Sequence, residues 1–165
     1  MAPTHLTLTC THNRPTAIES RKTLGQAPSG AHGYNKTMSI KRYGAEVAKN
    51  PQGLPFARAV EAVGWLYVSG QVPMVGGEII SGNIEVQARQ AIHNLVAILR
   101  EAGYGPENVV RCGVWLDDPR DFASFNKVFR EYFGEHPPAR ACVVSSMVID
   151  CKVEVDCVAY KAPQR

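Results

Sequence analysis

Short motifs that identify several large enzyme classes are absent from this sequence. It contains no GxSxG, Walker A, HExxH or GxGxxG pattern. These patterns position a nucleophilic serine, a nucleoside triphosphate, a zinc ion and a dinucleotide, respectively. The sequence therefore gives no support to a serine hydrolase of that type, a P-loop NTPase, a zincin or a dinucleotide-dependent enzyme.

Long apolar runs and paired cysteines are also missing. No run approaches the ~20 apolar residues that a membrane-spanning helix needs. The five cysteines are odd in number and include no CxxC pair, so neither a disulfide framework nor a zinc site is indicated. Four of the five lie in apolar stretches, where a free cysteine usually acts as a small hydrophobic residue. We expect a cytoplasmic protein with reduced thiols, no bound metal and no membrane partner.

The chain has no concentration of basic residues in its main part. The net charge of +3 arises in residues 1–37, which carry four basic residues and one acidic residue. Residues 38–165 carry 14 basic and 14 acidic residues and are neutral. A neutral domain without an RNP-type motif lacks the footprint of a protein that binds phosphate backbones. We therefore expect no nucleic-acid partner.

Composition divides the chain at about residue 37. Residues 1–37 are rich in Thr, His, Pro, Gly and Ser without a clear apolar period, which favours a flexible or weakly ordered N-terminal extension. They lack the apolar segment of a secretory signal, and they fit the amphipathic pattern of a transit peptide poorly. Met38 makes a natural start for one domain over residues 38–165.

The residue pattern predicts a mixed α+β domain with elements in the order β-β-α-β-α-β. The strand-like segments behind this order are six in number. They occupy residues 39–43, 59–63 and 65–69 before the first helix, 109–116 between the helices, and 140–147 and 152–160 after the second helix. A tight hairpin or a bulge at Gly64 is expected to join the second and third segments. Gly70 ends the third segment, and residues 73–82 are expected to form a loop around the Gly76–Gly77 pair.

Two helices are predicted, both on one face of the sheet. Asn83 is a good N-cap for a helix that extends to about residue 102, and Asp118 with Pro119 precedes a helix over residues 120–133. The faces expected in the core consist of Val86, Ile92, Leu95, Val96 and Leu99 on the first helix, and of Phe122, Phe125, Phe129 and Phe133 on the second. The other face of the sheet is left uncovered, which makes it a candidate for oligomerisation.

Arg140 lies at the start of a strand whose sequence is otherwise typical of a core. Pro137 and Pro138 restrict the backbone before it, and the apolar residues 141–144 follow. A surface ion pair is the ordinary role of an arginine at a strand end. However, a guanidinium keeps its charge when partly buried and matches a carboxylate with two parallel hydrogen bonds. The position therefore predicts a clamp for a substrate carboxylate.

Glu154 lies between two valines in the sequence VEV. It is either a solvent-facing residue of an edge strand or a carboxylate held against apolar surface. In the second case its pKa is raised and it can position or deprotonate a water molecule. If the segments 140–147 and 152–160 pair as a hairpin, Arg140 and Glu154 can share one region, but the sequence does not fix the register.

Four further residues carry weaker signals. Asn126 lies one position from the phenylalanine stripe, where a buried amide needs hydrogen-bond partners. Ser69 and Gly70 offer a hydroxyl and an accessible backbone N–H, or form a simple turn. Cys142 is either a nucleophile or a buried structural thiol, and the structural role is favoured because nothing nearby in the sequence lowers its pKa.

Taken together, residues 38–161 resemble the RidA/YjgF family of enamine and imine deaminases. PPARACVV with the later KVEVDCVAY resembles the family's PARS-C-V and V-E-I-E-x-I-A signature, and YVSGQVPM, QARQAIHNLVAIL and DFASFNKVFREYF support it. The resemblance implies a chorismate-mutase-like α+β fold. It also implies a homotrimer with active sites in clefts between subunits.

The resemblance also implies roles for single residues. The family's carboxylate-binding arginine falls on Arg140, and the glutamate that orients the attacking water falls on Glu154. Other positions that line the family's pocket fall on Asn126, Ser69, Gly70 and Cys142. The implied substrate is a small carboxylate whose iminium carbon is already electrophilic, so no metal or organic cofactor is expected.

One segment departs from the family pattern. The usual G-P-Y-S-Q-A-V is LPFARAV here, so that Phe56 replaces a pocket tyrosine, Ala57 a serine and Arg58 a glutamine. An added arginine can face a second carboxylate. With CGVWLDDPRDFASFN, this segment resembles the 2-aminomuconate deaminases. That branch hydrolyses a dicarboxylate enamine from aromatic degradation to a 2-oxo acid and ammonia.

Three other functions remain open from the sequence. One is a general deaminase of 2-aminoacrylate and related 2-imino acids, and another is a non-enzymatic trimer that binds small metabolites or acts like a chaperone. A pure binding protein needs Arg140 but has no need of a water-positioning acid such as Glu154. The third is an RNA-acting protein, against which the neutral domain charge argues.

Overall fold

The computed structural model describes residues 39–44 and 55–162 of the chain. The predicted N-terminal extension and the domain start at Met38 lie outside these residues. Within the described residues, no helix has the length and apolar character needed to cross a membrane.

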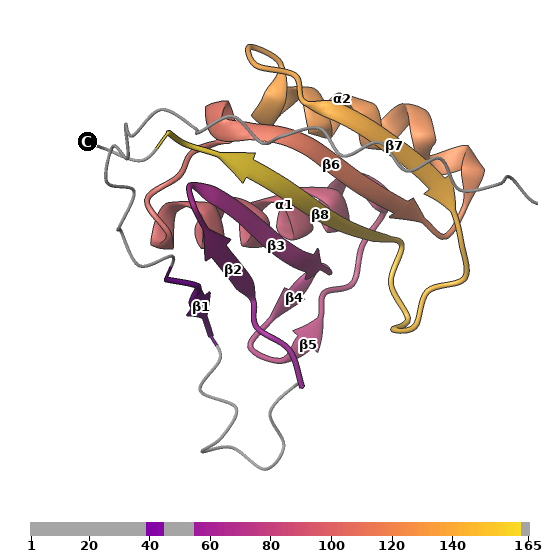
Figure 1. Ribbon diagram of the computed structural model, residues 1–165. Helices are drawn as coiled ribbons and strands as arrows, with labels where there is room; N and C mark the ends of the chain where they lie inside the picture. Colours follow the sequence, from indigo (N-terminus) through magenta and orange to yellow (C-terminus); the bar gives the residue numbers. More distant parts are fainter. Residues whose placement is uncertain (1–38, 45–54, 163–165) are drawn as a thin grey trace, which may run out of the picture. The chain divides into compact units, whose positions relative to one another are not determined.

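A six-stranded sheet forms the framework of the described residues (Figure 1). Its strands, in the spatial order β1-β2-β3-β8-β6-β7, are β1 (Lys41–Tyr43), β2 (Ala59–Ala62), β3 (Trp65–Gln71), β8 (Val153–Tyr160), β6 (Val109–Leu116) and β7 (Ala139–Val144). All neighbouring strands are antiparallel except β6 and β7, which are parallel. The predicted mixed α+β architecture is confirmed.

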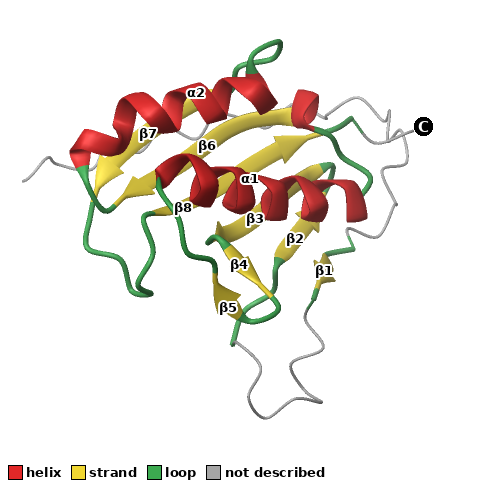
Figure 2. Ribbon diagram, turned by 180° about the vertical axis from the view of Figure 1, so that it is seen from behind, coloured by secondary structure: helices red, strands yellow, loops and turns green. Residues whose placement is uncertain are grey.

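Helices α1 (Ile84–Glu101) and α2 (Phe122–Phe133) cover one face of the sheet (Figure 2). Leu66 of β3, Leu95 of α1 and Phe125 of α2 are among the side chains buried between the two layers, together with Val155 of β8. Alternate residues of the strands point to the other face, which no described helix covers. This uncovered face agrees with the arrangement expected from the sequence.

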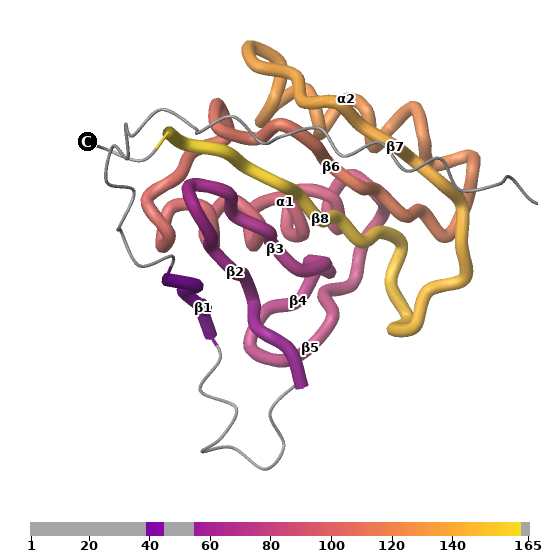
Figure 3. Tube along the Cα trace, viewed as in Figure 1, coloured from indigo at the N-terminus to yellow at the C-terminus, as the bar shows by residue number. Residues whose placement is uncertain are grey.

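The last two strands do not pair with each other, so the hairpin considered from the sequence is not formed. Strand β7 follows β6 through α2, and a parallel pair needs such a crossover. The chain then passes the end of β6 and enters the sheet as β8 on its other side (Figure 3). Strand β6 therefore separates the strands that carry Arg140 and Glu154.

The β2–β3 connection is the tight hairpin predicted from Gly64. Val63 and Gly64 have φ values of 52° and 81°, as in the two-residue turns that match the twist of a hairpin. Two other expectations need correction. Strand β3 continues through Gly70 to Gln71 with a bulge after Val68. The predicted loop after it contains a small two-stranded sheet, β4 (Met74–Val75) and β5 (Glu78–Ile79).

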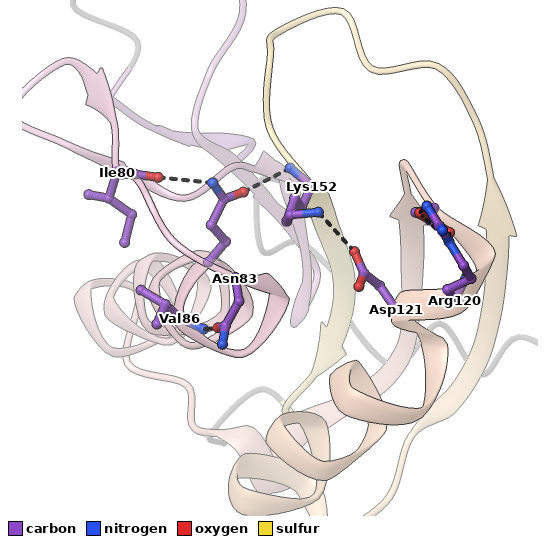
Figure 4. Close-up of polar contacts among 8 residues, drawn as sticks. Ile80, Asn83, Val86, Arg120, Asp121 and Lys152 are labelled. Atoms are coloured by element: carbon purple, nitrogen blue, oxygen red, sulfur yellow. Dashed lines mark hydrogen bonds and ion pairs between the residues drawn. The ribbon is translucent and has the colours of Figure 1, made fainter.

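Both helices begin close to the predicted residues. The Asn83 side chain accepts a hydrogen bond from the Val86 N–H and caps α1 (Figure 4). A short 3-10 turn, Pro119–Asp121, precedes α2. Val86 and Phe122, predicted in the core, are 43% and 46% exposed. Val86 lies off the side of α1 that carries the buried residues Ile84 and Ala88, and Phe122 is the first residue of α2.

The Gln87 side chain links α1 to the segment before α1 and to the segment before β8. Its amide Nε2 donates to the Ile80 carbonyl at 2.9 Å, and its Oε1 accepts from the Lys152 N–H at 2.8 Å. Lys152 Nζ also donates to Asp121 Oδ2 at 3.2 Å (Figure 4). Gln87 is buried, so these bonds fix the segments before α1 and β8 relative to the helix.

Candidate active site

Arg140 is held by α2 beneath the edge strand β7. It pairs with Cys112 of β6, a buried residue, and therefore faces the helices. Its Nη2 donates to Asn126 Oδ1 at 2.7 Å, and its guanidinium lies 4.7 Å from the ring centroid of Phe129. Guanidinium groups carry five N–H donors, so the bond to Asn126 orients the group while leaving donors for a carboxylate.

A groove of about 560 Å³ opens beside Arg140. It is lined by Asn126, Phe129, Arg130, Phe133, Gly134, Pro137, Pro138 and Arg140. The two prolines predicted to restrict the backbone form part of its wall, and Arg130 is a second guanidinium in its lining. The groove therefore combines positive charge with apolar and aromatic surface, which suits a small organic anion.

Glu154 lies on the opposite, uncovered face of the sheet. Its carboxylate rests against Gly70 of β3, where a Cβ atom would come within 1.8 Å of Glu154 Oε1. No real structure tolerates such a contact, so only glycine fits at position 70 with Glu154 in this conformation. Burial raises the pKa of Glu154, and the nearby Asp156 raises it further. The structure thus brings Gly70 and Glu154 together.

Three residues beside Glu154 were not recognised from the sequence. Trp115 of β6 is directly opposite Glu154, and its ring lies over Gly113. Asp156 of β8 is opposite Gly113 and accepts a hydrogen bond from its N–H at 2.7 Å. The alternation of Gly113 and Trp115 on one side of β6 was visible in the sequence, but their position beside Glu154 depends on the strand order.

Arg140 and Glu154 do not meet within one chain. Arg140 is in register with Cys112, which faces the helices, whereas Glu154 is in register with Trp115, three residues further along β6. Side chains at odd separations along a strand point to opposite faces. A site that uses both side chains therefore needs a second copy of the chain.

Residues 55–60, the described part of LPFARAV, lead into β2, which is near the opposite edge of the sheet from the β7 strand of Arg140. The Ser69 hydroxyl donates to the Ala57 carbonyl at 2.8 Å, which ties this segment to β3. Phe56 is half exposed. Arg58 Nη1 contacts Glu101 Oε2 at 3.1 Å, so its guanidinium points to the end of α1. Ser69 thus lies next to Gly70 on β3, whereas the Arg58 side chain is directed to Glu101 of α1.

Cys142 lies on the same side of β7 as Arg140 and is partly buried. Burial raises the pKa of its thiol despite the opposing effect of Arg140. Burial also raises the pKa of Cys112 to about 12. Thiols in this state are poor nucleophiles at neutral pH. Within the described residues, no group of three or more His, Cys, Asp or Glu side chains is arranged to hold a metal ion.

The chain is similar to proteins of one known family. Residues 48–161 match the family described as Endoribonuclease L-PSP. A RutC family protein of Pyrococcus horikoshii is 43% identical over 119 residues, which cover 70% of this chain and 94% of the relative. The human 2-iminobutanoate/2-iminopropanoate deaminase is 34% identical over 129 residues, covering 76% and 94% of the two chains.

Among solved structures, E. coli TdcF with bound serine has a TM-score of 0.62 at 30% identity, covering 67% of this chain and 91% of that one. The family match extends from residue 48 to the end of the last strand and includes the segments around Arg140 and Glu154. The chain therefore belongs to the Endoribonuclease L-PSP family, which is the RidA/YjgF/RutC family.

Proposed function

We propose that this protein is a hydrolytic deaminase of small enamine and imine carboxylates. The observation that carries the proposal is that a guanidinium, Arg140, and a carboxylate, Glu154, are each held in position, one on each face of the sheet. Arg140 is held by Asn126 and Phe129, and Glu154 rests against Gly70 with a raised pKa. The human relative is named for deamination of two 2-imino acids, and TdcF was crystallised with serine, an amino acid that carries a carboxylate.

The active site is proposed to form between two copies of the chain in a homotrimer. One copy supplies the groove with Arg140, and its neighbour supplies the uncovered face with Glu154. That face carries large exposed side chains, Trp65, Tyr67 and Tyr160, at the β3–β8 pair. The exposure of these side chains supports the assembly, because exposed apolar patches mark interaction sites.

The proposed reaction follows from these positions. Protonation of the enamine at carbon gives an iminium carboxylate. Arg140 binds its carboxylate through charge-assisted hydrogen bonds and so fixes the adjacent carbon. Water held by Glu154 attacks this carbon and forms a carbinolamine. Cleavage of the C–N bond then releases ammonia, and the C–O bond becomes the carbonyl of a 2-oxo acid.

For the substrate, we propose a dicarboxylate such as 2-aminomuconate. Arg58 replaces an uncharged residue of the family pattern, and Arg130 lines the same groove as Arg140. The contact of Arg58 with Glu101 is half exposed, and exposed pairs of this kind stabilise by about 0–1 kcal/mol. A substrate carboxylate can therefore displace Glu101. The general 2-imino acid deaminase remains the alternative within the same chemistry.

A third candidate comes from the family's description as an endoribonuclease. The neutral charge of residues 38–165 argues against it, because strong RNA binding requires neutralisation of several phosphates. An RNA-cleavage assay at low and physiological salt separates this activity from deamination. A metabolite-binding protein without turnover is distinguished by the ammonia-release assay, since it would bind a 2-oxo acid but release no ammonia.

The proposal is tested by ammonia release from enzymatically generated 2-aminomuconate and, in parallel, from 2-aminoacrylate. Arg140→Ala is expected to lower kcat/KM at least about a hundredfold, because each hydrogen bond to a charged group contributes about 1.5–3 kcal/mol. Near-normal turnover in Arg140→Ala would exclude the carboxylate clamp. Arg58→Gln and Arg130→Gln identify which arginine, if either, selects a second carboxylate.

A further inference from the structure

We propose that Asp156 is a positioning residue that acts on the reaction through Glu154. Because of its neighbour Asp156, Glu154 shuttles a proton during the reaction instead of only orienting water. The inference rests on the proposed function, and it assigns a role to a side chain outside the predicted site. It also gives Glu154 two tasks, first as a base toward water and then as an acid toward the leaving nitrogen.

The two carboxylates share one strand and one face. Asp156 follows Glu154 by two positions on β8, so both side chains point to the uncovered face. Residues at this separation on a strand lie about 7 Å apart at their Cα atoms. Two negative charges at such a distance repel each other, and the repulsion favours a proton on one of them.

Each carboxylate occupies space that a glycine leaves open. A Cβ atom on Gly70 would lie 1.8 Å from Glu154 Oε1, and one on Gly113 would lie 2.5 Å from Asp156 Oδ1. The Gly113 N–H also donates to Asp156 Oδ1 at 2.7 Å. This bond fixes the Asp156 carboxylate in place, whereas no hydrogen bond to the Glu154 side chain is found among the described residues. Of the two, Glu154 is therefore the group available to water and substrate.

The surroundings add an apolar wall. Trp115 stands opposite Glu154, and its ring extends over Gly113 toward Asp156. The other charged or titratable groups that flank the pair on this face are Arg111 of β6 and Tyr67 of β3, with Lys152 at the start of β8 directed to Asp121. Burial and the Asp156 charge both raise the pKa of Glu154.

The proton balance of the reaction requires such a group. When water adds to the iminium carbon, Glu154 takes one proton from it and the neutral carbinolamine forms. Glu154 then gives this proton to the amine nitrogen, the C–N bond breaks, and the hydroxyl proton leaves with ammonia as ammonium. A carboxyl whose pKa lies closer to neutrality exchanges protons in both directions more efficiently than an ordinary glutamate.

The test compares the wild type with Asp156→Asn, which removes the charge and keeps the shape. The pKa of Glu154 is followed by NMR of the ¹³C-labelled carboxyl, assigned with Glu154→Gln, and the pH profile of kcat/KM is measured beside it. We expect both the NMR pKa and the acidic limb to move to lower pH. We also expect kcat at neutral pH to fall by about tenfold, with KM little changed.

Asp150→Asn is the matched control, because it removes the same charge from the exposed loop before β8 and should shift neither quantity. An unchanged NMR pKa in Asp156→Asn overturns the inference, and so does a shifted NMR pKa with an unchanged pH profile. Absence of ammonia release from the wild type overturns the proposed function itself, and the NMR titration then still decides whether the two carboxylates are coupled.

Discussion

At position 70 of the candidate site, the Glu154 carboxylate leaves no room for a side chain. Gly70→Ala places a methyl group on the Glu154 carboxylate, since the Cβ position lies 1.8 Å from Oε1. The backbone there does not have a positive φ, so strain in the backbone itself is not the cause of any effect. We expect the variant to fold but to lose most deaminase activity, as measured by ammonia release alongside circular dichroism.

A double-mutant cycle isolates this contact. Gly70→Ala should lower the free energy of unfolding in the wild type but much less in a Glu154→Ala background, where the carboxylate is absent. Equal destabilisation in both backgrounds would show that Gly70 is required for another reason. Urea unfolding of the four proteins supplies the measurement.

Glu154 itself is expected to reduce stability at neutral pH. Its folded-state pKa is raised, so the folded protein favours the protonated form of Glu154. The stabilisation from this form is fully present at pH values below the pKa of Glu154 in the unfolded chain. That contribution is lost as the pH rises through the folded-state pKa. Glu154→Gln, which mimics the protonated form, should therefore have a higher Tm than the wild type at pH 7 and a similar Tm at pH 4. A lower Tm at pH 7 would contradict the burial of this carboxylate.

At the scale of elements, Gln87 ties α1 to the segments before α1 and β8. Gln87→Leu keeps the size of the side chain but leaves the Ile80 carbonyl and the Lys152 N–H without their partner. We expect a loss of about 1–3 kcal/mol in the free energy of unfolding, the cost of unsatisfied buried polar groups. His93→Ala, on the exposed side of the same helix, is the control and should change stability by less than about 0.5 kcal/mol.

The elements themselves could be predicted largely from local residue patterns. Alternation identified β6, and Asn83 identified the start of α1, because these signals depend on neighbours in the sequence. The order of strands could not be predicted in this way. Arg140 and Glu154 face opposite sides because their partners on β6, Cys112 and Trp115, are three positions apart. The positions of Trp115 and Asp156 beside Glu154 depend on the same strand order.

The part of the site that the sequence did predict is local in the same sense. Arg140 and Asn126 lie 14 residues apart and meet because the α2–β7 connection is short. Arg58 shows the limit of such reasoning, since its contact with Glu101 joins residues 43 positions apart. No pattern around Arg58 in the sequence indicates that partner.

At the scale of the whole molecule, the proposed activity belongs to the assembly and not to the single chain. One copy carries Arg140 in a groove under the helices, and the Glu154 carboxylate lies on the reverse face of the same sheet. In the proposed homotrimer, each site would take Arg140 from one copy and Glu154 from its neighbour. The cytoplasmic location and the flexible or weakly ordered N-terminal extension at residues 1–37 stay predictions.

The most direct measurement is the activity of mixed assemblies of two inactive variants, Arg140→Ala and Glu154→Gln. They are co-expressed with different affinity tags, and the assemblies that carry both tags are purified. If each site takes Arg140 from one copy and Glu154 from the next, every closed ring of three copies that contains both variants has one intact site, which is about a third of the sites. The account predicts restoration of about that fraction of wild-type ammonia release. Mixed assemblies as inactive as each variant alone would contradict it, because both residues would then have to act within one chain.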